Sequence, residues 1–392
     1  MSVLSPPRAD RSADRDVRER YRAFVDERVV PYVAGYDLSG AVPRDLLAAA
    51  AAAGMFGAVL PVHRGGTGTG WTDFGALHEE VGRGCSSLRS FLTVHSMALF
   101  ALDRWGTESA RDRWLAPMAA GDALGAFCLT EAGAGSDIAG LATTATRCDG
   151  GYVLNGRKLW TTAGQCADVL LVFARTDRGV SAFFVDASGP GVTRSPVDDM
   201  LGTRASMLAQ ITFTDCRIAS DALIGLEGFG LGVATAALDI GRYSVATGSV
   251  GIIQACLESS VRHSSARVQG GGPISGHHAV QRMITAMAVD ASAARLLCRE
   301  AGRLKDAGDP ATLSATCRAK YFASTAAMRA AADAVQIHGA AGCASGADPA
   351  RYFRDAKVME IIEGSTQILE PIIAADAMTR HAGVAAPGGS IR

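Results

Sequence analysis

The sequence predicts an α+β multidomain fold, in which a helical domain precedes a small β-domain and a second helical domain follows it. Two changes in the residue pattern along the chain support this prediction. Apolar residues recur at helical spacing over 17–122, and short runs rich in β-branched and aromatic residues then appear over 123–230. Long alanine-rich stretches return over 231–383. The residues outside these domains, 1–16 and 384–392, are predicted to be disordered tails.

The N-terminal region is predicted to be helical because its apolar residues share one face. Val17, Tyr21 and Val25 repeat every four residues, and Pro31 stops this helix. The residues before it are polar and lack the apolar core of a signal peptide. Two further helices are predicted over 44–53 and 71–82.

The middle region is predicted to be a β-domain because short apolar runs alternate with turn residues. Asn155-Gly156 stands between two such runs, which is a strong local signal for a hairpin turn. Alanine-rich segments typical of helices then return in three long stretches. The strands are expected at 151–154, 169–173, 182–185 and 210–213, and the long helices at 231–265, 278–306 and 313–338.

Composition excludes several classes of protein. The 392 residues carry a formal net charge of -1, and no basic stripe indicates a nucleic-acid partner. The longest uncharged apolar stretch, Leu46–Val62, is shorter than the ~20 residues of a membrane span and is broken by glycine and proline. The nine cysteines form no C-x-x-C pair, so we expect neither a disulfide framework nor a metal site, and a cytoplasmic location.

The segment from Cys128 to Asp137 contains two glycines spaced by one residue, followed by Ser136. Such a backbone can approach a ligand closely, and the hydroxyls of Thr130 and Ser136 can serve a flat ring or a phosphate. A tight turn without a ligand explains the glycines equally well. The third glycine of a dinucleotide-binding fingerprint is absent after Gly133 and Gly135, so a Rossmann site is excluded.

Two further segments have both a structural and a functional interpretation. Trp160, which precedes Thr161 and Thr162, either fills the core or stacks against a flat cofactor. Glu363 follows two isoleucines and precedes Gly364. A carboxylate there either caps a helix or is a desolvated general base, because burial raises a carboxyl pKa toward the working pH.

Together, in this order and inside this frame, the three segments resemble the acyl-CoA dehydrogenase family over residues 17–381. The resemblance is strongest over 128–140 and 336–367, the latter including Arg354-Asp355-Ala356. It implies an N-terminal helical domain, a β-barrel-like middle domain and a C-terminal four-helix bundle. It also implies FAD between the last two, in a homotetramer or homodimer whose neighbouring subunit completes the FAD site.

By this resemblance, Glu363 would take the proton α to a thioester carbonyl while a hydride leaves the β-carbon for the flavin. A few family members carry the base on an earlier helix, where Gly241-Arg242-Tyr243 offers no carboxylate. The substrate would meet Ser136, Asp239, Arg242 and Gly364. FAD would be held by Phe127, Leu129, Thr130, Gly135, Ser136, Trp160, Thr161, Thr162, Arg267, Gln336, Gly339, Ala340, Ser365 and Gln367.

The implied partners are an acyl group on CoA or on an acyl carrier protein, and an electron-transfer flavoprotein or another electron acceptor. The segments 85–97 and 356–364 resemble a branch of the family that acts on carrier-bound acyl groups in polyketide extender-unit pathways. His95, within the first segment, either contacts substrate or is a satisfied core residue, and the second is the commoner outcome. A flavin oxidase or monooxygenase on the same fold is the alternative activity, and a non-catalytic docking protein is the alternative class.

Overall fold

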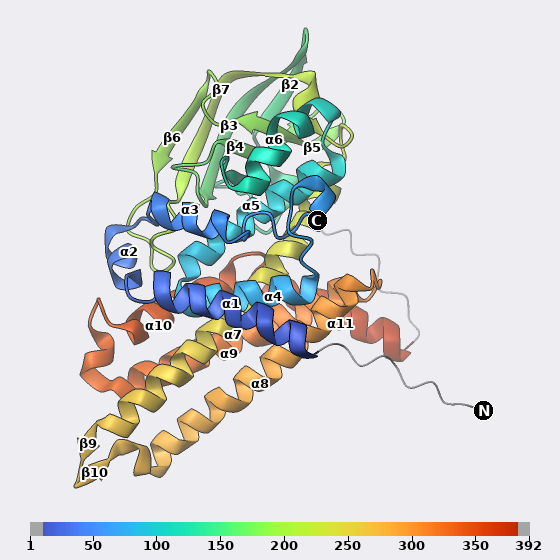
Figure 1. Cartoon of the computed structure of the whole chain (residues 1–392). Coiled ribbons are helices and arrows are strands. Elements are labelled where there is room, and N and C mark those ends of the chain that lie inside the picture. The colour runs from blue at the N-terminus through green and yellow to red at the C-terminus, as the bar shows by residue number, and fades with distance from the viewer. Residues whose placement is uncertain (1–10, 383–392) are drawn as a thin grey trace.

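Helices from both ends of the chain pack together, and the β-domain stands at one end of this helical body (Figure 1). The computed structural model describes residues 11–382. It confirms the predicted fold class, with helical N- and C-terminal regions around a β-domain built on a mixed sheet. In the described part of the chain, no helix is both long and apolar enough to cross a membrane.

The N-terminal region contains α1 (Arg11–Arg28), α2 (Val33–Ser39), α3 (Arg44–Ala52), α4 (Trp71–Gly84), α5 (Ser86–Trp105) and α6 (Glu108–Ala120). Helix α1 begins within the predicted tail 1–16, whose first ten residues lie outside the described part, as does the predicted tail 384–392. Most of α4 and α5 is buried. Their polar residues therefore lie inside the protein.

The β-domain contains β1 (Gly125–Cys128), β2 (Thr144–Cys148), β3 (Gly151–Thr161), β4 (Val169–Thr176), β5 (Gly179–Asp186), β6 (Val192–Pro196), β7 (Ala209–Ala219) and β8 (Leu223–Ile224). The strand order is β6-β7-β3-β2-β4-β5-β8, and β1 pairs with β4 in parallel. The apolar faces of these strands form the core of the domain.

The hairpin predicted at Asn155-Gly156 is wrong, because β3 runs straight through these residues. Its pairing with β7 shifts register between Leu154 and Gly156, so the Asn-Gly pair forms an irregularity inside a strand. Asn155 is held there by Asp215, whose backbone N–H donates to the Asn155 side chain at 2.8 Å. The chain instead reverses between β2 and β3, where Gly150 has a φ of 80°.

The C-terminal region contains α7 (Gly230–Ala266), α8 (His278–Asp306), α9 (Thr312–His338), α10 (Asp348–Ile361) and α11 (Thr366–Ala382). The three predicted long helices are therefore confirmed as α7, α8 and α9. Helix α7 also packs on α4, where an added Cβ at Gly82 would lie 2.7 Å from the Cα of Gly248. This close contact joins the N- and C-terminal helices into one core.

Candidate active site

Glu363 lies in the short turn between α10 and α11, with its backbone in the left-handed region at a φ of 57°. A non-glycine residue rarely adopts this conformation, and it costs on the order of 1 kcal/mol or more. The next residue, Gly364, also has a positive φ, of 93°. Strain of this kind persists only where the surroundings hold it in place.

Two buried cations hold this turn. Lys320 of α9 donates from Nζ to the carbonyl oxygens of Gly364 at 2.8 Å and of Glu360 at 3.3 Å. Arg242 of α7 donates from Nε to the carbonyl oxygen of Glu363 at 3.2 Å. The turn that carries the carboxylate is thus fixed from two helices.

The carboxylate of Glu363 lies against α7 in a desolvated position. Its Oε2 is buried and has no hydrogen-bond partner in the described structure. Gly241 makes room for it, since an added Cβ at that position would overlap the carboxylate. Burial raises the pKa of Glu363 to about 7, although the positive charges of Arg89, Arg242 and Lys320 act to lower it. Such a group can accept a proton near neutral pH.

Trp160 is the most unusual of the predicted cofactor residues. It stands near the end of β3 with a φ of 57°, and 52% of its surface is exposed. A large aromatic ring held in a strained backbone and open to solvent is suited to stack on a flat ligand. Thr161 is buried and its hydroxyl donates to the Sγ of Cys128 at 3.7 Å, whereas Thr162 is half-buried.

The glycine-containing segment lies beside this strand and is open on one side. An added Cβ at Gly133 or Gly135 would meet nothing within 4 Å, and Ser136 is exposed. The carbonyl oxygen of Thr130 accepts a hydrogen bond from the Leu159 backbone at 2.9 Å, which ties the segment to β3. Leu129 is buried, and the half-buried Phe127 packs against Phe173.

A buried ion pair, which sequence reasoning missed, anchors the same segment. Lys158 is fully buried and lies 2.6 Å from Glu131, which also accepts from the backbone N–H groups of Ala142 and Thr143. Burial alone would raise the pKa of Glu131, but these hydrogen bonds outweigh it and lower the pKa. The pair connects the open loop to the strand that carries Trp160.

The remaining predicted cofactor residues fall into two groups. Ser365 and Gln367 follow Glu363 at the start of α11. Arg267 is exposed at the end of α7. Gln336, Gly339 and Ala340 lie beside it at the end of α9, because His338 of α9 stacks on His263 of α7 with ring centroids 4.2 Å apart. Arg242 and Arg267 are separated by about 37 Å along α7 at the helical rise. The residues of this distant group, Gln336, Gly339 and Ala340 with Arg267, therefore do not meet Glu363 within one chain.

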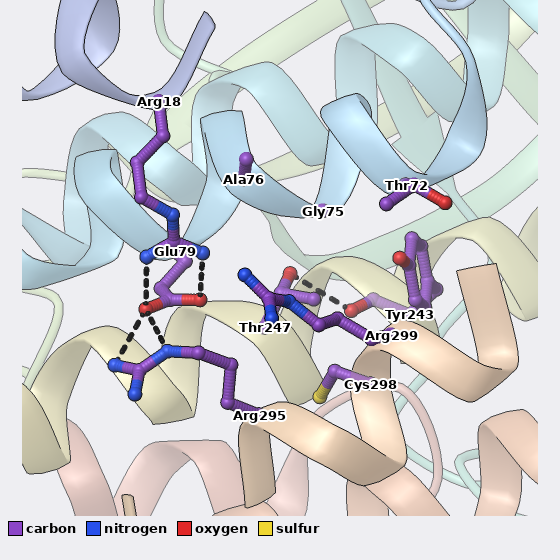
Figure 2. Close-up of a pocket in the computed structure, with 10 residues that line it drawn as sticks. All are labelled: Arg18, Thr72, Gly75, Ala76, Glu79, Tyr243, Thr247, Arg295, Cys298 and Arg299. Carbon is purple, nitrogen blue, oxygen red and sulfur yellow. Dashed lines mark hydrogen bonds and ion pairs between the residues drawn. The ribbon is translucent and has the colours of Figure 1, made fainter. Parts of the chain in front are cut away.

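Asp239, one turn before Arg242, forms an ion pair with Lys305 of α8. An open groove of about 550 Å³ lies beside it, between the N-terminal parts of α7 and α9. A second hollow, among α1, α4, α7 and α8, measures only about 20 Å³ and holds a charge network in which Glu79 bonds Arg18 and Arg295 (Figure 2). That volume suits a single water, so this hollow is not a substrate site.

His95 is a satisfied core residue. Its Nε2 lies 3.0 Å from the carbonyl oxygen of Met118, its Nδ1 accepts from the backbone N–H of Gly125, and Phe56 packs on it edge to face. Burial lowers the pKa of His95 to about 4, so it is neutral at physiological pH.

A β-domain between two helical regions, with an exposed aromatic ring and a desolvated carboxylate, suits an oxidoreductase that holds a flat cofactor, and comparison with known proteins agrees. The family models of the acyl-CoA dehydrogenase N-terminal, middle and C-terminal domains match residues 12–122, 126–216 and 228–378. The chain is 35% identical to the mitochondrial short-chain specific acyl-CoA dehydrogenase of Rattus norvegicus, over 91% of this chain and 88% of that protein. It therefore belongs to the acyl-CoA dehydrogenase family.

Two solved structures are also similar along most of their length. A glutaryl-CoA dehydrogenase from Mycobacterium smegmatis in complex with FADH2 has a TM-score of 0.90 at 30% identity, with 97% of this chain and 96% of that chain covered. FkbI, for biosynthesis of the methoxymalonyl extender unit of the polyketide Fk520, has a TM-score of 0.84 at 34% identity, with 92% and 99% covered. The cofactor is FAD, and the exposed Trp160 and the open glycine segment fit a flat, phosphate-bearing group.

Proposed function

We propose that this protein desaturates an acyl thioester and that Glu363 is the base that removes the α-proton. The observation that carries the proposal is the buried Oε2 of Glu363, which has no hydrogen-bond partner in the described structure and stands in a strained turn. A carboxylate that only capped a helix would bond backbone N–H groups. This one is held ready to accept a proton from outside the chain.

The residues around Glu363 have separate tasks in this proposal. Lys320 and Arg242 bond the backbone on both sides of the base and keep its direction fixed. Their charges, with that of Arg89, also favour the negative charge that develops on the thioester when the proton leaves. Gly241 leaves the space in which the carboxylate reaches the substrate. FAD, when bound, supplies the acceptor for the hydride of the β-carbon.

We infer that Trp160, Thr161, Thr162 and the segment from Phe127 to Ser136 hold the flavin end of FAD. The groove beside Asp239 would take the thioester carrier. Arg267, Gln336, Gly339 and Ala340 would hold a FAD molecule whose flavin lies in a neighbouring subunit, since they are far from Glu363 in their own chain. Ser365 and Gln367 would contact FAD next to the base.

Two carriers of the acyl group are compatible with this proposal. The similarity to FkbI over 92% of this chain favours an acyl group on a carrier protein and a role in extender-unit biosynthesis. The similarity to the mitochondrial short-chain enzyme favours acyl-CoA to the same degree. The two substrates share the phosphopantetheine arm, so a direct comparison is needed.

The test is anaerobic mixing of the FAD-loaded protein with matched acyl groups on CoA and on an acyl carrier protein. Bleaching of the flavin absorbance by either supports thioester desaturation, and the faster carrier identifies the substrate. An enzyme that bound flavin but was bleached by neither would contradict the proposal. Rapid reoxidation of the bleached flavin by air alone would favour an oxidase.

A further inference from the structure

The groove beside Asp239 is lined by small, apolar and uncharged polar side chains, and Asp239 is the only charged residue among the described residues that line it. Lys305, the cation behind Asp239, is 5% exposed and forms an ion pair with it. Asp309, next to the lining residue Pro310, accepts a hydrogen bond from the N–H of Ala311 at 2.8 Å and so places a carboxylate at the start of α9. The described lining therefore offers no free positive charge to a phosphate group.

CoA and an acyl carrier protein present the same amide-containing arm, but they differ beyond it. CoA continues into a nucleotide with a pyrophosphate and a further phosphate, which bind to cations or to free N–H groups. On a carrier protein, the arm ends in one phosphodiester at the protein surface. The buried Oδ1 of Asp239 has no hydrogen-bond partner in the described structure, so it can accept from an amide of the arm. The lining thus suits the arm and not the nucleotide.

The groove runs along α7 toward the base. Leu231, Thr235 and Asp239 follow one another at four-residue spacing on one face of this helix. Arg242, three residues further along, bonds the Glu363 turn. From Leu231 to Arg242 the helix rises about 17 Å. An arm that lies in the groove therefore enters beside Leu231, and the molecule that carries the arm rests around that residue.

Large apolar side chains are exposed around this entrance. Four of them, Leu226, Phe229, Leu231 and Leu313, have between 40% and 75% of their surface exposed, and we call them the entrance patch. Leu231 and Leu313 line the groove. Phe229 lies against Gly232 of the lining, in the turn that begins at Leu226. Exposed apolar side chains that gather at the mouth of a groove mark a surface that contacts another protein.

Two exposed arginines flank the entrance patch. The guanidinium of Arg104 lies over the ring of Trp105, 5.4 Å from its centre, and Trp105 packs edge to face on Phe229. Arg178 lies beside Gly228, where an added Cβ would be 3.5 Å from the Cβ of Arg178. Neither arginine forms an ion pair in the described structure. Exposed cations of this kind favour an acidic partner, because opposite charges steer it to the surface.

We propose that the entrance patch, flanked by Arg104 and Arg178, docks an acidic acyl carrier protein whose arm enters the groove beside Leu231. This inference rests on the proposed thioester desaturation and names the partner that delivers its substrate. The entrance patch contacts apolar side chains of the carrier next to its arm, and the two arginines meet its carboxylates. Because the patch lies outside the groove, these contacts strengthen binding of the carrier without touching the reacting thioester.

The test compares one acyl group on three carriers: an acidic acyl carrier protein, CoA and pantetheine. The acyl group is the one that bleaches the flavin fastest. We expect kcat/KM of the wild-type protein to be at least about tenfold higher with the carrier protein than with CoA or pantetheine. Leu226→Glu and Arg104→Glu should each lower kcat/KM for the carrier protein by about tenfold, through KM, because like charges repel the acidic partner. Neither should change kcat/KM for the acyl-pantetheine.

Arg28→Glu is the matched control, since Arg28 is an exposed arginine at the end of α1 without an ion pair in the described structure, and it should change neither value. Equal kcat/KM with CoA and carrier protein in the wild type, or an equal loss with carrier protein and pantetheine in Leu226→Glu, would overturn the inference alone. Sedimentation of Leu226→Glu tests another occupant, because a changed oligomeric state would assign the entrance patch to a second copy of the chain and also overturn it. Failure of every thioester to bleach the flavin would overturn the proposed function instead.

Discussion

Lys158 in the β-domain and Lys320 in the C-terminal helices are both fully buried, but their partners differ in kind. Lys158 meets the carboxylate of Glu131, whereas among residues 11–382 Lys320 bonds only the carbonyl oxygens of Glu360 and Gly364. Burial lowers the pKa of Lys320 to about 8, and the charge of Glu363 opposes this. We therefore expect Lys158, which is paired with Glu131, to stabilise the fold, and Lys320, which lies beside Glu363 without an ion-pair partner in the described structure, to affect the proton transfer at Glu363.

The largest effect expected is on the removal of the α-proton by Glu363, the carboxylate beside Lys320. Glu363→Gln should lower kcat by about 10²–10⁴-fold, because the amide cannot take the α-proton. FAD should remain bound, since glutamine has almost the shape of glutamate and Lys320 and Arg242 still hold the turn through its backbone. Single-turnover flavin bleaching measures the change, with the exposed Glu300→Gln as control. Retention of more than a tenth of the wild-type rate would contradict the assignment of the base.

At the ion pair of Lys158 and Glu131, the expected effect is on the stability of the fold. Lys158→Met leaves Glu131 buried without its cation, which should cost about 3–5 kcal/mol of unfolding free energy. Lys357→Met, which removes a half-exposed partner of Glu360, should cost under about 1 kcal/mol. Urea unfolding measures both. If the two variants lost equal stability, the buried pair of Lys158 and Glu131 would contribute no more to folding than an exposed pair, and its structural role would be wrong.

The fit of the carboxylate against α7 provides a third test. Gly241→Ala adds a methyl group that overlaps the Glu363 carboxylate. Because this displaces the base from its position, kcat should fall by about 100-fold. Gly35→Ala in α2 is the matched control, because an added Cβ there meets nothing within 4 Å. It should leave kcat unchanged and, if anything, stabilise the helix. An active Gly241→Ala protein would show that the carboxylate works from another position.

The smallest effect expected is a shift in pH dependence. A base must be ionised, so kcat/KM should rise with pH and level off above a midpoint near 7, where Glu363 loses its proton. Lys320 lowers the pKa of Glu363, so Lys320→Met should move this midpoint upward. A pH profile with a carrier-bound or CoA substrate measures both. A midpoint that stayed fixed or moved downward in the variant would show that the charge of Lys320 does not lower the pKa of Glu363.

Local sequence was sufficient to predict the long helices, the domain order and the segments that hold Trp160 and Glu363, because these depend on periodicity and short motifs. Arg89 and Lys320 stand far from Glu363 in the chain, and only the packing of α5 and α9 on α7 and α10 brings them near it. An arginine inside the apolar run of α5 was the available signal for Arg89. The Asn155-Gly156 prediction failed because pairing with β7 overrides the local turn preference.

Because α7 is long, two inactive variants of this protein should complement each other when they are expressed together. Arg242 and Arg267 are about 37 Å apart along this helix, so each chain of the proposed assembly contributes a base to one active site and a distant FAD contact to another. A Glu363→Gln chain and an Arg267→Glu chain, each inactive in its own oligomer, would form mixed pairs in which one site carries both defects and the other carries neither. Co-expression of the two variants should therefore restore activity that neither possesses alone.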